Sequence, residues 1–266
     1  MIAERLNLSF KHQVELKREG ILGINISILN LYMALEQLED WITTGKQKYV
    51  CVAPAHSIME GYNQPALKRI FNESGMTTAD GMAVVWLLKL RGHHHVQRVY
   101  GPDLLLATCA YGLKRGYRHY FYGGEQGVVE TLVDRLCAKY SGLQVAGTFT
   151  PPFQALTAKD DQKIIDQINV AHADILWVGL GSPKQEYWMH AHLGRLKVPV
   201  MIGVGAAFDF LSGRKPQAPL WMQRSGLEWL FRFSNEPRRL WPRYRQYPKF
   251  VLLAILELIG MLQTRS

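Results

Sequence analysis

The sequence contains few cysteines. Cys51, Cys109 and Cys137 are the three present among 266 residues, and no two of them form a C-x-x-C pair. An odd number of cysteines without that spacing indicates neither a disulfide framework nor a zinc site. We therefore expect a protein of the reducing cytoplasm, in which Cys51 fills space in the core.

The sequence also lacks long apolar segments. Residues 1–20 have no apolar stretch of the signal-peptide type, so nothing indicates export. The apolar run at residues 250–262 is too short for a membrane-spanning helix, which needs about 20 residues. It also contains Glu257, so we expect it to lie on a surface or to pack. A hydrophobic content of 48% and a mean hydropathy of −0.08 exclude a disordered chain and a polytopic membrane protein.

Complete nucleotide-binding signatures are missing as well. The chain has no full G-x-G-x-x-G, no Walker A lysine pattern and no D-x-D motif. It has no internal repeat and no low-complexity tract. A nucleotide site in this chain would therefore have to be formed by residues outside these standard motifs.

Positive charge is the unusual part of the composition, with a formal net charge of +9. Residues 213–249 contain nine basic and two acidic residues and so carry +7 of it. Their arginines alternate with aromatic residues such as Trp221, Trp229 and Trp241. Segments of this kind serve anionic membranes, nucleic acids or phosphorylated substrates, and composition alone does not choose among them.

Short apolar runs alternate with amphipathic stretches from about residue 49 onward, which predicts βα units. We expect an α/β fold with a Rossmann-like, mainly parallel sheet flanked by helices over residues 1–212, and a basic helical appendage over residues 213–266. Strands are expected at residues 49–53, 118–122, 143–149, 175–179 and 198–204, and helices at residues 57–74, 82–90, 103–115, 126–140, 160–171 and 183–193.

Capping residues refine the expected helices. Ser57 and Asp103 suit N-cap positions, and Pro183 suits the first position of its helix. Gly194 is expected as the C-cap glycine that ends the same helix.

Three glycine-bearing turns follow expected strands, at residues 122–127, 179–186 and 203–206. Ligands of parallel α/β sheets bind beyond the carboxyl ends of the strands. Glycines there let the backbone approach a ligand, and a following helix N-terminus offers N–H groups to phosphate. Tight turns alone would also explain each glycine, but three turns along one edge favour a nucleotide-like ligand. The candidate ligand-binding glycines are Gly123, Gly124, Gly181 and Gly205.

Polar residues near these turns are candidates for the chemistry. Lys184, Gln185 and Glu186 fall in the first turn of a helix, where they face a ligand or simply solvent. Asp80 follows a short expected strand and precedes an apolar helix, so its carboxylate is either a general base with a raised pKa or an N-cap. Asp209 stands among apolar residues and either caps locally or contacts a ribose or base.

Three consecutive histidines, His93, His94 and His95, could suggest a metal site. Neighbouring residues of an extended chain point to alternating sides, and adjacent histidines rarely make a site without distant ligands. We expect a solvated loop and no metal site.

Several runs in this order and spacing resemble the WecG/TagA/CpsF bacterial glycosyltransferases (glycosyltransferase family 26), from about residue 20 to residue 248. The resemblance implies an inverting transfer of a sugar from a UDP donor to a polyprenyl-diphosphate-linked saccharide, at the inner face of the plasma membrane. We expect no cofactor beyond the donor; metal dependence stays open, although no D-x-D motif indicates it. The matching runs are residues 78–82, 98–103, 121–124, 179–186, 203–209, 226–232 and 236–239.

The resemblance also implies roles for individual residues. Asp80 falls on the family's proposed catalytic base. Arg98, Gln185 and Asp209 fall on positions associated with the nucleotide-sugar. The appendage arginines Arg232 and Arg239 fall on positions thought to complete the site, where a guanidinium offsets charge on the leaving diphosphate.

One stretch departs from the family. A Thr-x-Asn motif is common at the end of the first sheet strand, whereas this chain has Val52 and Pro54 at those positions. Either His56 or Ser57 supplies the lost polar contact, or the donor sugar differs. The sequence leaves the donor sugar, the acceptor linkage and the oligomeric state open, including a homo-oligomer.

Two other functions are compatible with parts of the sequence. An NAD(P)-dependent oxidoreductase would suit a Rossmann-like sheet, but the glycine fingerprint is incomplete. A nucleic-acid-binding module would suit the +7 segment, but that segment has no reader motif, and its tryptophans suit a membrane interface better. We therefore expect an anionic membrane surface, and not nucleic acid, as the partner of the basic segment.

Overall fold

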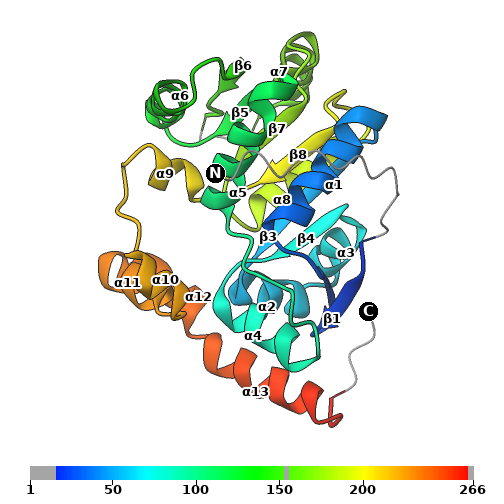
Figure 1. Cartoon of the computed structure of the whole chain (residues 1–266), viewed down its shortest axis with the longest axis vertical. Coiled ribbons are helices and arrows are strands. Elements are labelled where there is room, and N and C mark those ends of the chain that lie inside the picture. The colour runs from blue at the N-terminus through cyan, green and yellow to red at the C-terminus, as the bar shows by residue number, and fades with distance from the viewer. Residues whose placement is uncertain (1–15, 153–155, 263–266) are drawn as a thin grey trace.

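The structure is a computed structural model that describes residues 16–152 and 156–262. Six strands form a parallel sheet in the order β4-β3-β8-β7-β5-β6, with helices on both faces (Figure 1). This confirms the expected α/β fold. The strands are β3 (Lys48–Ala53), β4 (Met76–Ala79), β5 (Arg118–Gly123), β6 (Gln144–Phe149), β7 (Ile175–Gly179) and β8 (Val200–Gly203).

The helices of the α/β body connect these strands, as parallel strands require crossovers. They are α1 (Leu31–Thr44), α2 (Ala55–Asn63), α3 (Pro65–Glu73), α4 (Met82–Leu90), α5 (Gly101–Gly112) with the 3₁₀ turn η2 (Leu113–Arg115), α6 (Val128–Lys139), α7 (Ala158–Val170), α8 (Lys184–His192) and α9 (Ala207–Leu211).

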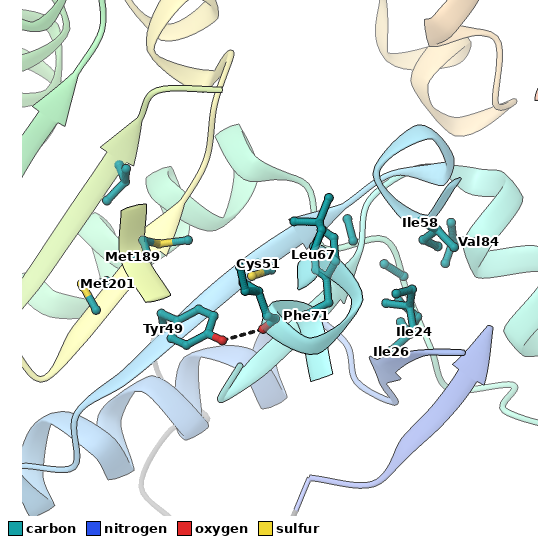
Figure 2. Close-up of a cluster of buried hydrophobic side chains, with 14 of the residues drawn as sticks. Ile24, Ile26, Tyr49, Cys51, Ile58, Leu67, Phe71, Val84, Met189 and Met201 are labelled. Carbon is teal, nitrogen blue, oxygen red and sulfur yellow. Dashed lines mark hydrogen bonds between the residues drawn. The ribbon is translucent and has the colours of Figure 1, made fainter. Parts of the chain in front are cut away.

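The core lies on both faces of the sheet because strand side chains alternate. In β3, Tyr49 and Cys51 face the helices α2, α3 and α8, whereas Val50 and Val52 face α1 and α5. Figure 2 shows the first of these layers, in which the Tyr49 hydroxyl donates a hydrogen bond to the Ile70 carbonyl. Cys51 is fully buried there, as expected for a residue that fills the core.

A β-hairpin and a helix near the start of the described chain were not predicted. The strands β1 (Arg18–Ile21) and β2 (Ile24–Ser27) form an antiparallel hairpin beside β4. The helix α1 follows, with Asn30 as its N-cap and Gly45 as its left-handed C-cap. Both lie before residue 49, where the alternating βα pattern begins.

Some expected helix boundaries were wrong. The helix expected at residues 57–74 is interrupted at Gln64, because Pro65 forces the preceding residue into extended backbone and starts a new helix. Ser57 is not an N-cap but a buried residue inside α2, which begins after Pro54. Asp103 lies in the first turn of α5 and does not cap it.

The two boundaries of α8 each differ by one residue from the expected helix at residues 183–193. Pro183 is the N-cap of α8, which begins at Lys184. Leu193 is the C-cap of α8, and Gly194 follows it with φ of +84°.

Four further helices follow the last strand: α10 (Leu220–Arg224), α11 (Glu228–Asn235), α12 (Pro237–Tyr244) and α13 (Tyr247–Leu258). They lie along the outside of the α/β body, orange to red in Figure 1. Phe250 and Ala254 of α13 are buried in the core cluster on the α2 face. Glu257 accepts hydrogen bonds from Leu22 N (3.0 Å) and from Arg91 (2.6 Å), which fixes α13 to the body.

None of the helices within residues 16–152 and 156–262 combines the length and the apolar character needed to cross a bilayer. In that same part of the chain no group of three or more His, Cys, Asp or Glu residues is arranged to hold a metal ion. His93 pairs with Glu19 at 3.0 Å, and His94 and His95 are exposed in a loop, as expected.

Candidate active site

A cavity of about 1020 Å³, here called the polar cavity, opens at the carboxyl edge of the sheet. The loops that follow β5, β7 and β8 form much of its wall, so the three glycine turns meet at one edge. Most of the expected site residues line it: His56, Ser57, Asp80, Gly124, Gly181, Lys184, Gln185, Gly205, Asp209, Arg232 and Arg239.

Three expected residues, Gly123, Glu186 and Arg98, do not line the polar cavity. Gly123 pairs with Gly179 across neighbouring strands at φ of +121°, and a Cβ there would lie 2.7 Å from the Gly179 carbonyl carbon. Close packing of the two strands therefore requires glycine at this position. Glu186 is fully buried beneath the cavity wall, and Arg98 lies behind Asp80.

Asp80 lies between β4 and α4, and its side chain is 15% exposed. It is not the N-cap of α4, because that position belongs to Gly81 and no side chain caps the helix. Its Oδ1 instead accepts hydrogen bonds from Arg98 Nε (3.3 Å) and Nη2 (3.1 Å). Burial raises the pKa of Asp80; the Arg98 charge opposes this shift and the Glu228 charge adds to it.

Arg98 joins Asp80 to the C-terminal helices. Its Nη2 donates a 2.6 Å hydrogen bond to Oε2 of Glu228, the first residue of α11, and its guanidinium lies 3.9 Å from the centre of the Tyr100 ring. Glu228 is 8% exposed, so its charge is compensated mainly by this arginine. Glu228 was not among the expected site residues, although it stands within the 226–232 run that resembles the family.

Cations from the C-terminal region line the other side of the polar cavity. Arg232 lies 5.4 Å from the Phe210 ring centre, and no described residue forms a hydrogen bond or ion pair with its guanidinium. Arg243 donates to the Ser182 carbonyl at 2.9 Å. Lys215 and Arg243 were not expected in the site. They are far in sequence from the strand ends, so the sequence does not indicate that they line the cavity.

Asp209 and Arg239 belong to one chain of ion pairs on this wall. Lys215 Nζ lies 3.0 Å from Asp209 and 3.1 Å from Glu236, and Glu236 in turn pairs with Arg239. Asp209 therefore does not act as a local cap. These pairs hold three appendage residues against α9, the helix that follows β8.

Gln185 is oriented by its neighbour. Its Nε2 donates a 3.0 Å hydrogen bond to Glu186 Oε1, and its own Oε1 is buried without a partner among the described residues. A Cβ on Gly205 would lie 3.5 Å from that oxygen, so the amide oxygen lies beside the cavity wall and can accept a hydrogen bond from a ligand. Burial raises the pKa of Glu186 to about 7.

His56 and Ser57 lie near the positions where the sequence departs from the family pattern. Burial, together with the charges of Arg243 and Arg232, lowers the pKa of His56 to about 3, so the imidazole is neutral. Its Nδ1 has no partner among the residues that the structure describes. Ser57 Oγ lies 3.2 Å from Ser182 Oγ. Val52 and Pro54 also line the polar cavity.

A comparison with protein families matches residues 20–264 to the "Glycosyl transferase WecG/TagA/CpsF family". The chain belongs to this glycosyltransferase family. It is 27% identical over 211 residues to an N-acetylglucosaminyldiphosphoundecaprenol N-acetyl-beta-D-mannosaminyltransferase of Bacillus spizizenii, which covers 79% of this chain and 80% of the relative. It is 29% identical over 188 residues to the enzyme of the same name from Bacillus subtilis (strain 168), covering 71% of each chain.

Family membership confirms the resemblance seen in the sequence. It favours a glycosyltransferase over the NAD(P)-dependent oxidoreductase that was the alternative. The matched region includes the α/β body and the C-terminal helices α10–α13. The contact between Arg98 and Glu228 therefore lies wholly within the family region, as do the basic residues of the cavity wall.

Proposed function

We propose that this glycosyltransferase moves a sugar from a UDP donor to a polyprenyl-diphosphate-linked saccharide in cell-surface polysaccharide synthesis, with inversion at the anomeric carbon. The observation that carries the proposal is the placement of Asp80, a largely buried carboxylate with a raised pKa at the wall of a cavity whose other wall is basic. The names of the two relatives support an undecaprenyl-diphosphate-linked acceptor and an N-acetylmannosamine donor. Glucose and the uronic acid of N-acetylmannosamine are the other donor sugars to test.

In the proposed reaction, the acceptor hydroxyl oxygen attacks the anomeric carbon from the face opposite UDP. The new C–O bond forms as the bond between that carbon and the diphosphate oxygen breaks, and UDP leaves with the electron pair. The Asp80 carboxylate takes the proton from the attacking hydroxyl. Arg98 favours the ionised form of Asp80 and so opposes the effect of burial on its pKa.

The basic wall serves the leaving group in this proposal. Arg232 is the cation best suited to it, because its guanidinium is not committed to any described residue and charge-assisted hydrogen bonds to phosphate are strong. Arg239 and Lys184 lie at more exposed positions of the same cavity. Gln185 and Asp209 offer a hydrogen-bond acceptor and a carboxylate to the nucleotide-sugar.

The C-terminal helices support a membrane-peripheral enzyme at the inner face of the plasma membrane. Val251, Leu252 and Ile255 of α13 and its C-cap residue Ile259 are each at least half exposed and lie on one face at helical spacing. An apolar helix face beside arginines suits the interface of an anionic leaflet, where each basic residue contributes about 1 kcal/mol. We propose residues 213–266 as the membrane-binding part and residues 1–212 as the donor-binding part.

A donor screen tests the proposed function. Purified enzyme would be mixed with a polyprenyl-diphosphate-linked N-acetylglucosamine acceptor and, in turn, UDP-N-acetylmannosamine, its uronic acid or UDP-glucose, and UDP release would be measured. We expect acceptor-dependent release with one of these donors. Saturable NAD(P) binding with no release from any UDP-sugar would contradict the proposal.

A further inference from the structure

A second cavity, of about 480 Å³, lies between α2 and α4 of the body and the C-terminal helices α11–α13. We call it the apolar cavity, because most of the side chains that line it are hydrophobic or aromatic. Figure 1 shows α4 and α13 near each other at the lower end of the molecule. The large apolar and aromatic side chains of the lining are Met82, Trp86, Trp229, Tyr244, Tyr247 and Phe250.

The apolar cavity meets the polar cavity at four residues. Pro54, His56, Asp80 and Arg232 line both of them. Asp80 therefore lies where a ligand in one cavity would reach a ligand in the other. A transfer reaction with two large substrates needs such a junction, because the attacking hydroxyl and the leaving group lie on opposite faces of the sugar.

Polar groups of the apolar cavity are concentrated at this junction. Arg232 and the neutral His56, whose Nδ1 lacks a partner among the described residues, lie at the inner end. Asp80 and Glu228 line the same end, and both are paired with Arg98, so Arg232 is the cation that remains for a ligand. At the other end Trp86 is 48% exposed and Val251 is 51% exposed. A ligand that matches this arrangement carries an anionic group at one end and a hydrocarbon chain at the other. Burial of the chain is favourable because it removes apolar surface from water. A phosphate forms strong charge-assisted hydrogen bonds with arginine.

We propose that the apolar cavity binds the first isoprene units of the polyprenyl-diphosphate acceptor, with the diphosphate toward the junction of the two cavities and the chain leaving between α4 and α13. This proposal rests on the proposed function and adds the place where its lipid is recognised. The exposed apolar face of α13, with Leu252 and Ile255, continues outward from the cavity toward a membrane. The acceptor then reaches Asp80 from the membrane side while the donor occupies the polar cavity.

Ala83 offers a direct test, because it is exposed on α4 and lines the apolar cavity. Ala83→Trp narrows the cavity without removing any polar group. Leu90→Trp is the matched control, since Leu90 is 72% exposed on the same helix and lies outside the cavity lining. KM would be measured for an acceptor with a long polyprenyl chain and for one in which a phenyl group replaces the chain.

We expect Ala83→Trp to raise the KM of the long-chain acceptor at least about ten-fold, since each buried CH₂ contributes strongly to binding. The KM of the phenyl acceptor and of the UDP-sugar should stay within about two-fold, because neither needs the apolar cavity. Leu90→Trp should leave all three values unchanged. Equal increases for both acceptors, or no increase for either, would overturn the proposal.

A binding measurement separates this proposal from the proposed function. Calorimetric titration with farnesyl diphosphate and with inorganic pyrophosphate reports the lipid contribution without turnover. We expect farnesyl diphosphate to bind at least about ten-fold more tightly, and Ala83→Trp to abolish the difference. Transfer from a UDP-sugar without this difference would leave the proposed function standing and overturn the lipid site. Displacement of farnesyl diphosphate by a short-chain zwitterionic phospholipid at equal concentration would also overturn it, since it would indicate a general acyl site.

Discussion

Glu228, the first residue of α11, accepts a 2.6 Å hydrogen bond from Arg98. This contact spans 130 positions of the sequence and joins the C-terminal helices to the edge of the sheet beside Asp80. Because Arg98 also donates to Asp80, the C-terminal region and the proposed base share one guanidinium. The position of the C-terminal helices and the ionisation of Asp80 are therefore coupled.

The substitution Glu228→Gln tests this coupling. The negative charge of Glu228 raises the pKa of Asp80, so its removal should lower that pKa. Since the carboxylate form of Asp80 is the active base, the acidic limb of the kcat/KM profile should move to lower pH. Glu130→Gln is a matched control, because Glu130 is exposed on α6. An unchanged limb, or a shift to higher pH, would count against the coupling.

Glu186 should make stability depend on pH. Its pKa is raised from 4.5 to about 7 in the folded state. Between these pH values the Glu186 carboxyl is therefore ionised in the unfolded chain but still protonated in the folded protein. The free energy of unfolding should therefore fall as pH rises from about 4.5 to about 7, by about 3 kcal/mol from this group. Glu186→Gln keeps the acceptor for Gln185 and should flatten that fall in urea titrations at pH 5 and pH 8. The same fall in the variant and the wild type would show that another group causes it.

The exposed face of α13 should determine membrane binding. Replacing Leu252 and Ile255 together by aspartate places charges where apolar side chains meet the bilayer. We expect sedimentation with anionic vesicles to weaken by about ten-fold or more, because about 0.8 kcal/mol is lost for each CH₂ no longer buried. Val170→Asp on α7, where the side chain is 76% exposed, should leave vesicle binding unchanged. Full binding by the double variant would place the membrane contact elsewhere.

The sequence predicts the sheet well because its strands are short apolar runs. Residues 49–53 and 175–179 are expected strands, and β3 and β7 contain them. The break at Gln64 could have been predicted from Pro65, whose effect on the preceding residue is local. The hairpin of β1 and β2 could not, because its packing beside β4 is a tertiary contact.

The candidate site is predicted only in part, for a related reason. Asp80 and Gln185 stand at strand or helix ends, where position along the chain indicates position at the cavity. Glu228 and Arg243 are charged residues of helices whose sequence pattern does not show which face is buried, and Lys215 lies in the irregular segment between α9 and α10. Their contacts with Arg98, Asp209 and Ser182 depend on how the C-terminal helices pack.

The central claim is that Asp80 is the general base of a sugar transfer from UDP, and Asp80→Asn tests it most directly. Asparagine keeps the size of the side chain and an acceptor for Arg98 but cannot take a proton. With the donor identified by the screen, kcat for acceptor-dependent UDP release should fall by about 10²–10⁴-fold. UDP binding, measured by calorimetry, should remain within about two-fold of wild type, which shows that the fold is intact. An unchanged kcat in the folded variant would contradict the account.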